Sequence, residues 1–66
     1  MDIVVNGQAE NCAPETSISG FLAERGYEAS AVVVERNGQI IARGTFALTT
    51  LQEDDCLEIV QFVGGG

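Results

Sequence analysis

Residues 16–26 read TSISGFLAERG, and the position of this segment between two hairpin-like stretches decides the fold. Ile18, Phe21 and Leu22 stand at i, i+3 and i+4, which predicts one apolar stripe on an α-helix of about ten residues. Gly20 lies within the stripe and costs about 1 kcal/mol relative to alanine, so this helix depends on packing for its stability. A helix with a single apolar face has to lay that face on another element of the fold.

The two ends of the predicted helix carry residues that are typical of helix caps. Thr16 or Ser17 supplies a side-chain oxygen for the first backbone amides. At the other end, Arg25 suits the negative end of the helix dipole, and Gly26 suits a left-handed C-cap. The capping residues and the apolar stripe therefore predict the same helix.

A predicted β-hairpin lies on each side of the helix. Each contains the dipeptide Asn-Gly, at residues 6–7 and 37–38, which favours a type I′ turn because both positions need a positive φ. Pro14 ends the first hairpin, since proline cannot donate to a β-ladder. The unbroken apolar run Val32–Val34 favours a strand that is covered on both faces or that crosses an interior region of the fold. The predicted strands are Ile3–Val5 and Gln8–Ala13 before the helix, and Val32–Arg36 and Gln39–Arg43 after it.

The sequence after the second hairpin predicts one more strand. Residues 45–55 show no clean period, and we expect a turn or a short helix that carries Phe46 and Leu48 inward. Residues 56–63, CLEIVQFV, are rich in β-branched and aromatic side chains and predict the last strand. This strand joins the first one only by entering between the two hairpins. The predicted fold over residues 1–63 is α+β, a mixed sheet of four or five strands packed on one helix, which is the β-grasp (ubiquitin-like) fold.

The composition limits the partners of the chain. Sixty-six residues are enough for one domain, and 45% of them are hydrophobic, which is typical of a chain that folds. Ten Asp and Glu residues stand against three Arg, with no Lys and no His, for a formal net charge of −7. Such a surface repels phosphate backbones and anionic lipids, so we expect no nucleic acid and no membrane as partner. It suits either a solvated acidic domain or a protein that is steered to a basic partner.

The two cysteines, Cys12 and Cys56, are too few for a disulfide framework. Without a His they complete neither a zinc site nor an iron–sulfur cluster, so no metal is expected. Both fall in or beside predicted strands, which favours two small buried apolar side chains. Free thiols favour a cytoplasmic, reducing location. Thiol catalysis is an alternative, but the chain holds no Lys or His to activate a thiol.

Three glycines, Gly64, Gly65 and Gly66, follow the last predicted strand and close the sequence. A run without side chains suits a flexible tail, residues 64–66, that enters a narrow channel of another protein, because three extended residues span about 10 Å. The alternative is an inert, frayed end. The chain has no Lys and no phosphate-cradling Gly-rich loop before a helix, so activation of a carboxylate on Gly66 requires another protein.

Four stretches of the chain carry a family resemblance. They are VVNG at residues 4–7, TSISGFLAERG over the predicted helix, VVVERNGQIIAR in the second hairpin and LQEDDCLEIVQFVGGG at the end. Together they resemble the ubiquitin-like sulfur carrier proteins, and most closely the thiamine-pathway carriers of the ThiS type. The small subunit of molybdopterin synthase is the relative most easily confused with them. One departure is the acidic corner Glu53-Asp54-Asp55-Cys56, where family members commonly have a glycine-containing turn, so the geometry of this loop stays open.

The resemblance implies a carrier that is a co-substrate of partner enzymes and not itself an enzyme. In that family an adenylyltransferase of the ThiF type uses ATP and Mg²⁺ to adenylate the terminal carboxylate, which here is that of Gly66, at the end of the tail with Gly64 and Gly65. A cysteine desulfurase supplies sulfur indirectly, and the adenylate becomes a thiocarboxylate. A thiazole synthase of the ThiG type then takes this sulfur into the thiazole ring of thiamine. The resemblance implies no cofactor bound by the chain itself.

Delivery of such a tail requires a docking surface near the last strand. Alternation along this strand puts Leu57, Ile59, Gln61 and Val63 on one face and Glu58, Val60 and Phe62 on the other. One face has to line the core, which leaves the other exposed, and an exposed apolar patch with a charged rim is a common partner-binding surface. We therefore predict Val60, Phe62 and Glu58 as partner-binding residues. The acidic corner is either part of that rim or a solvated loop. A passive β-grasp interaction module with an inert tail is the other class of function that the pattern allows.

Overall fold

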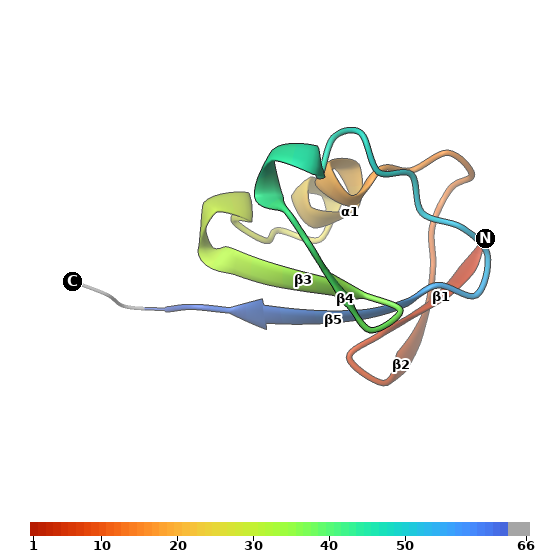
Figure 1. Ribbon diagram of the computed structural model, residues 1–66. Coiled ribbons are helices and arrows are strands. Elements are labelled where there is room, and N and C mark those ends of the chain that lie inside the picture. The colour runs from red at the N-terminus through yellow and green to blue at the C-terminus, as the bar shows by residue number, and fades with distance from the viewer. Residues whose placement is uncertain (64–66) are drawn as a thin grey trace.

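The computed structural model of the chain describes residues 1–63. They form a five-stranded sheet with one α-helix across one of its faces, as Figure 1 shows. The two-layer α+β arrangement predicted from the sequence is thus confirmed. The elements are β1 (Asp2–Val5), β2 (Gln8–Asn11), α1 (Ile18–Glu24), the 3₁₀-helix η1 (Ala29–Ala31), β3 (Val32–Arg36), β4 (Gln39–Ile41), the 3₁₀-helix η2 (Arg43–Thr45) and β5 (Cys56–Gln61).

The strands lie in the order β2-β1-β5-β3-β4. One antiparallel hairpin consists of β1 and β2 and the other of β3 and β4, while β5 lies between them, parallel to β1 and antiparallel to β3. The prediction that the last strand enters between the hairpins is confirmed. As the central strand, β5 pairs with β1 at Cys56 and Leu57 and with β3 from Leu57 to Gln61, so its start has a neighbour on both sides and its end is paired with β3.

Both Asn-Gly turns have the predicted backbone conformation. Asn6 and Gly7 have φ values of 50° and 80°, and Asn37 and Gly38 have 50° and 86°. Two successive positive φ values are the mark of a type I′ turn, whose twist matches that of the strands it joins. The turn chemistry of the sequence therefore positions both hairpins.

The helix α1 is shorter than predicted, with seven residues instead of about ten. Its N-cap is Ser17, whose hydroxyl accepts a hydrogen bond from the Gly20 amide at 2.9 Å. A Cβ at position 20 would lie only 3.3 Å from that hydroxyl, which explains the glycine there. Gly26 has a φ of 81°, the left-handed conformation predicted for it, and turns the chain toward η1. Neither α1 nor any other helix of the described residues is long and apolar enough to span a membrane.

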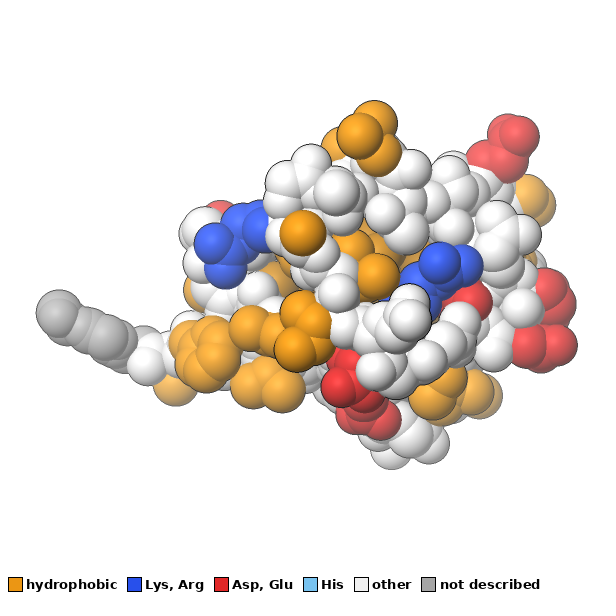
Figure 2. Space-filling model, in the orientation of Figure 1, with side chains coloured by type: hydrophobic (Ala, Val, Ile, Leu, Met, Phe, Trp, Pro, Cys, Tyr) orange, Lys and Arg blue, Asp and Glu red, His pale blue; other side chains and the backbone are white. Residues whose placement is uncertain are grey.

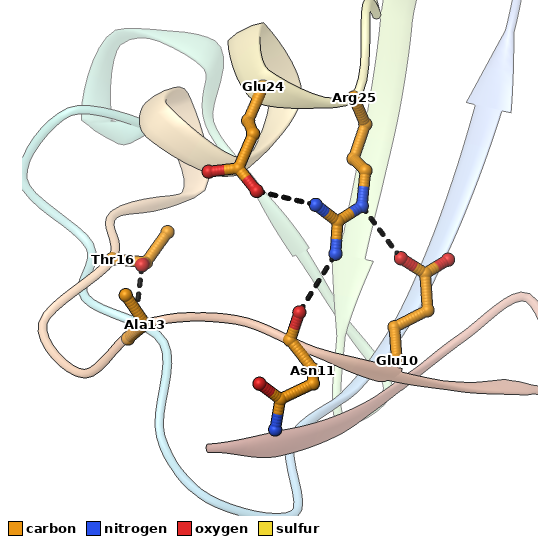
Figure 3. Close-up of polar contacts among 6 residues, drawn as sticks. All are labelled: Glu10, Asn11, Ala13, Thr16, Glu24 and Arg25. Carbon is orange, nitrogen blue, oxygen red and sulfur yellow. Dashed lines mark hydrogen bonds and ion pairs between the residues drawn. The ribbon is translucent and has the colours of Figure 1, made fainter.

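Arg25 is the C-cap residue of α1, and its side chain ties the helix to β2 (Figure 3). Its Nε donates to Glu10 at 2.8 Å, and Nη2 donates to the Asn11 carbonyl at 2.9 Å. Its Nη1 contacts Glu24 at 2.6 Å, and its guanidinium carbon lies 4.7 Å from the centre of the Phe21 ring. The helix is thus fixed to the sheet at its end as well as through its apolar stripe.

The hydrophobic core lies between α1 and the sheet. The irregular segment after β4 contributes Phe46, as predicted, but Leu48 is 83% exposed and Leu51 is buried in its place. The Phe46 amide donates to Arg43 and the Leu48 amide to Thr45, so this stretch coils, and side chains two positions apart in a helical turn point in different directions. The other core residues are Ile3, Val5, Cys12, Ile18, Phe21, Leu22, Val32, Val34, Leu57 and Ile59.

Three strands end earlier than predicted: β5 ends at Gln61 and not at Val63, and β2 and β4 end where a turn begins. The strand β2 ends at Asn11, two residues short of the predicted end, because the chain enters a turn in which the Thr16 amide donates to the Ala13 carbonyl at 3.3 Å. Likewise β4 ends at Ile41, since Arg43 begins η2. In both places a turn closed by local hydrogen bonds takes over before the pattern of apolar residues changes.

Candidate functional site

The central strand β5 connects the folded body to the glycines that the sequence singles out. It runs from the end of the domain near the N-terminus to the opposite side (Figure 1). Beyond the strand, the Phe62 amide still donates to the Ala31 carbonyl at 2.7 Å, and Val63 after it is 84% exposed. The predicted reactive tail, Gly64–Gly66, lies outside the described residues, so its role stays a prediction.

The asparagines of the two hairpin turns hold β5 from its two sides. Asn6 binds both backbone groups of Ile59: its Oδ1 accepts from the amide at 2.7 Å and its Nδ2 donates to the carbonyl at 3.2 Å. The Oδ1 of Asn37 accepts from the Cys56 amide at 2.9 Å, and the Asn37 amide donates to the Cys56 carbonyl at 2.8 Å. Sequence reasoning missed this role, because no local pattern distinguishes such an asparagine from one that only forms a turn.

Asp55, in the acidic corner, is a buried residue that fixes the start of β5. It is 4% exposed. Its Oδ2 accepts from Arg36 Nε and from the Gln52 amide, both at 2.8 Å, and its Oδ1 accepts from Asn37 Nδ2 at 2.9 Å. Burial by itself raises the pKa of this carboxyl, but these hydrogen bonds and the charge of Arg36 outweigh burial and leave the pKa below its ordinary value. For Asp55, both expectations about the acidic corner, a partner-facing rim or a solvated loop, are wrong.

The rest of the acidic corner forms a tight turn without a glycine. Asp54 has a φ of 69°, a conformation that glycine adopts most readily, and its amide donates to the Asp2 carbonyl at 2.7 Å. The Glu53 carboxylate accepts from the Asp2 amide at 3.2 Å. The loop therefore keeps its left-handed residue, and the hydrogen bonds to β1 hold it in place.

The sheet face opposite α1 carries the predicted partner-binding residues. We call it the open face and define it by its outward side chains: Val4, Val33, Glu35, Ile40, Cys56, Glu58, Val60 and Phe62. Val60 is 54% and Phe62 is 62% exposed, whereas Leu57 and Ile59 on the other side of β5 are buried. Figure 2 shows hydrophobic side chains gathered on the surface at the left of the view. The structure thus brings Val60, Phe62 and Glu58 onto one surface, and their part in partner binding stays a prediction.

Two expectations about side chains on the open face are wrong. The sequence predicts two buried cysteines, but only Cys12 is buried and Cys56 is exposed, because it alternates outward at the start of β5. Coverage of Val33 on both faces, one of the two expectations for the run Val32–Val34, is wrong: Val33 is half-buried, since the described residues place no helix on this face. Gln61 and Val63 have the parity of the core residues but are exposed because they lie past the end of the core.

A hollow of about 410 Å³ lies elsewhere on the domain and shares no residue with the open face. It is lined by Met1, Pro14, Glu15 and residues 50–53. No group of three His, Cys, Asp or Glu side chains within residues 1–63 is arranged to hold a metal ion. The candidate site is the open face, which adjoins the point where the described chain ends.

Comparison with known proteins identifies the family of the chain. Residues 3–66 match the ThiS family. The chain is 42% identical over 66 residues to the thiazole synthase of Magnetococcus marinus, a match that covers 100% of the chain and 20% of that protein. The chain thus spans a fifth of the length of this relative. It is 38% identical over 63 residues to the sulfur carrier protein ThiS of Bacillus subtilis, covering 94% of the chain and 96% of that protein.

A solved structure has the same fold. The crystal structure of the thiamine biosynthesis protein ThiS from Geobacter metallireducens is similar to the chain with a TM-score of 0.82 and 33% identity, over 100% of both chains. This likeness confirms the predicted β-grasp fold and the predicted resemblance to the thiamine-type carriers. By its sequence over residues 3–66 and by its fold, the chain belongs to the ThiS family.

Proposed function

We propose that this chain is a sulfur carrier of thiamine biosynthesis, which acts as a co-substrate and not as an enzyme. In this proposal a ThiF-type adenylyltransferase uses ATP and Mg²⁺ to adenylate the carboxylate of Gly66. Sulfur that derives from a cysteine desulfurase then takes the place of AMP, so that the chain carries a thiocarboxylate. A ThiG-type thiazole synthase accepts this sulfur for the thiazole ring.

The observation that carries the proposal is the match to the ThiS family over residues 3–66, which includes the three glycines. The relatives support its two halves separately. One is a sulfur carrier protein by name and nearly equal in length to the chain, and another is a thiazole synthase of which the matching segment makes up 20%. A carrier-like segment within a thiazole synthase supports the ThiG-type enzyme as a partner.

The chemistry of a carboxylate explains why the carrier needs an activating partner. An α-carboxyl group has a pKa of about 3.3–3.7, so at neutral pH it is an anion and a poor electrophile. Adenylation converts it into a mixed anhydride with AMP as the leaving group. A glycine at the reacting position leaves the acyl carbon unshielded, because it has no Cβ.

In this proposal the folded part of the chain, residues 1–63, holds the terminal carboxylate in position for a partner. The strand β5 is paired with β3 up to Gln61, and the Phe62 amide donates to the Ala31 carbonyl beyond it, so these contacts direct the chain where it leaves the sheet. The open face lies beside this exit and presents Val60 and Phe62 to a partner. A rigid body that docks by this face brings the glycines to the partner in one orientation.

An intact-mass measurement on protein made together with the adenylyltransferase and the sulfur source tests the proposal. We expect a mass gain equal to the replacement of one oxygen by sulfur. A chain without Gly66 serves as the control and should show no gain. The same spectrum tests whether Gly66 ends the polypeptide, which the proposal requires. A wild-type chain that never gains sulfur would contradict the proposed function.

A further inference from the structure

Two glutamates face each other in the middle of the open face. Glu35 on β3 and Glu58 on β5 are direct partners in the antiparallel register. Directly opposite residues have Cβ atoms about 4.5–5.5 Å apart, and two like charges in that position destabilise a sheet. Glu35 is half-buried, which weakens the screening of its charge by water. The register thus sets two like charges opposite each other on the open face.

The chain has no cation of its own to relieve this repulsion. It contains three arginines and neither lysine nor histidine. All three arginines are engaged elsewhere: Arg25 with Glu10 and Glu24, Arg36 with Asp55, and Arg43 with the carbonyls of Ala29 and Val32. Within residues 1–63 no arginine is paired with Glu35 or Glu58, so these two carboxylates are open to a cation that a partner supplies.

Apolar side chains surround the glutamate pair. Ile40 is registered opposite Glu35 on the side away from β5 and is 72% exposed, and Val33 and Val60 form the next pair along β3 and β5. Figure 2 shows acidic side chains that adjoin the hydrophobic surface at the left of the view. A partner that covers these apolar side chains removes water from both carboxylates. The loss of water strengthens the repulsion between the two carboxylates if they stay unpaired. It strengthens their attraction to a cation if the partner supplies one.

We propose that the open face binds a partner protein that places an arginine or lysine side chain between Glu35 and Glu58, within a ring of apolar contacts. The inference rests on the proposed function, takes the ThiF-type adenylyltransferase as the partner that docks on this face, and specifies the chemistry of the docking surface. A guanidinium suits the place best because its planar fork donates to two carboxylates at once. A second copy of this chain does not fit, since it brings two more carboxylates and no free arginine.

The test compares two double variants that remove the same charge. Glu35→Gln with Glu58→Gln changes the open face, and Glu15→Gln with Glu28→Gln changes two exposed residues outside it. Glutamine keeps the size of the side chain in both. The affinity of each full-length chain for the purified adenylyltransferase is measured over a range of salt concentrations, and the thermal unfolding of each free chain is measured in parallel.

We expect the open-face variant to bind at least about tenfold more weakly, with a flatter salt dependence, because a buried charge pair is lost. The same variant should unfold at a higher temperature than the wild type, since the repulsion is gone. The control variant should keep its affinity within about twofold, because exposed charges contribute little. Weaker binding combined with higher stability is a result that a merely structural role does not produce.

Three results would overturn the inference. One is an open-face variant that binds like the wild type, and another is an equal loss in both double variants, which would mean steering by net charge alone. The third is a dimer of the free chain that tightens in the open-face variant, which would assign the face to a second copy. A wild-type chain that gains sulfur while the open-face variant binds normally contradicts this inference only, and the proposed function stands.

Discussion

The side chain of Asn6 makes both backbone hydrogen bonds of Ile59, a residue 53 positions away. The strands β1 and β5 are registered only at Val4 with Cys56 and at Val5 with Leu57, because the chain then turns into the hairpin. The Asn6 amide donates to the Leu57 carbonyl at 2.9 Å, and its side chain continues the ladder past the end of the strand. An asparagine that forms a turn thus also closes the central strand of the sheet.

Replacement of Asn6 tests this relationship. We expect Asn6→Gly to lower the free energy of unfolding by about 1–3 kcal/mol, because the amide and the carbonyl of Ile59 both lose their partners. Glycine tolerates the φ of 50°, so the loss reports the hydrogen bonds. Asn6→Ala should lose roughly 1 kcal/mol more through backbone strain. Denaturant titration followed by circular dichroism measures both, and an unchanged midpoint for Asn6→Gly would contradict the assignment.

The hydrogen bonds of Asp55 predict how the stability of the domain declines at acidic pH, which we call the acid limb of its stability curve. Its pKa lies below the ordinary 3.8 in the folded chain, so its contribution to stability is present above about pH 4. It is lost as the pH falls through the unfolded and then the folded pKa. We expect Asp55→Asn to be less stable at pH 7 by about 1–2 kcal/mol and to show a flatter decline below pH 4.

The neighbouring residue provides the control for Asp55. Asp54 is exposed and has a φ of 69°, which asparagine tolerates, so Asp54→Asn should keep both the stability at pH 7 and the acid limb of the wild type. Thermal unfolding from pH 2 to pH 7 measures all three chains. Parallel acid limbs for wild type and Asp55→Asn would show that the Arg36 pairing of Asp55 does not contribute as described.

Glu15 occupies a position that favours glycine. The turn from Ala13 to Thr16 has Pro14 at its second position and Glu15, with a φ of 68°, at its third, which is the pattern of a type II turn. We expect Glu15→Gly to raise the free energy of unfolding by about 0.5 kcal/mol, because the relief of backbone strain exceeds the cost of fixing the more flexible glycine. Glu28→Gly, at a φ of −92°, should lower it. Urea titration tests the pair of variants, and a loss of stability in both would show that the backbone at Glu15 is not strained.

The two cysteines are expected to differ in reactivity. Cys56 is exposed on the open face and Cys12 is buried in the core. A thiol reagent added to the native chain should therefore modify one thiol quickly, and the second only at the rate of unfolding. Cys56→Ser should remove the fast phase and Cys12→Ser should leave it. Two fast thiols in the native wild-type chain would be inconsistent with the packing around Cys12.

The apolar part of the open face should contribute to partner binding. We expect Val60→Thr combined with Phe62→Ser to weaken binding to the adenylyltransferase by about tenfold or more, because central apolar contacts dominate such interfaces. Leu48→Ser is the matched control, since Leu48 is also an exposed apolar residue but lies outside the sheet. Both variants should unfold near the wild-type temperature. Equal affinities of the two variants for the adenylyltransferase would show that Val60 and Phe62 are not part of the docking surface.

Much of the fold could be predicted because its signals are local. The stripe of Ile18, Phe21 and Leu22 identified the helix, and the two Asn-Gly dipeptides identified the hairpins. The place of the last strand followed from the pairing that remained open between them. Local signals failed where a turn interrupted the pattern, as at Leu48. They also failed where a run of apolar residues favoured coverage of both faces of the strand, as at Val33.

The amino-acid sequence by itself determined the order of the elements, the turn types and the parity of β5, since these depend on residues within a few positions of one another. Only the tertiary structure decided that Cys56 is exposed and that Asp55 is buried beside Arg36. It also placed Glu35 opposite Glu58, a pair separated by 22 intervening residues. The reason is that burial and charge pairing arise from contacts between distant segments, and a single sequence carries no periodic signal for them.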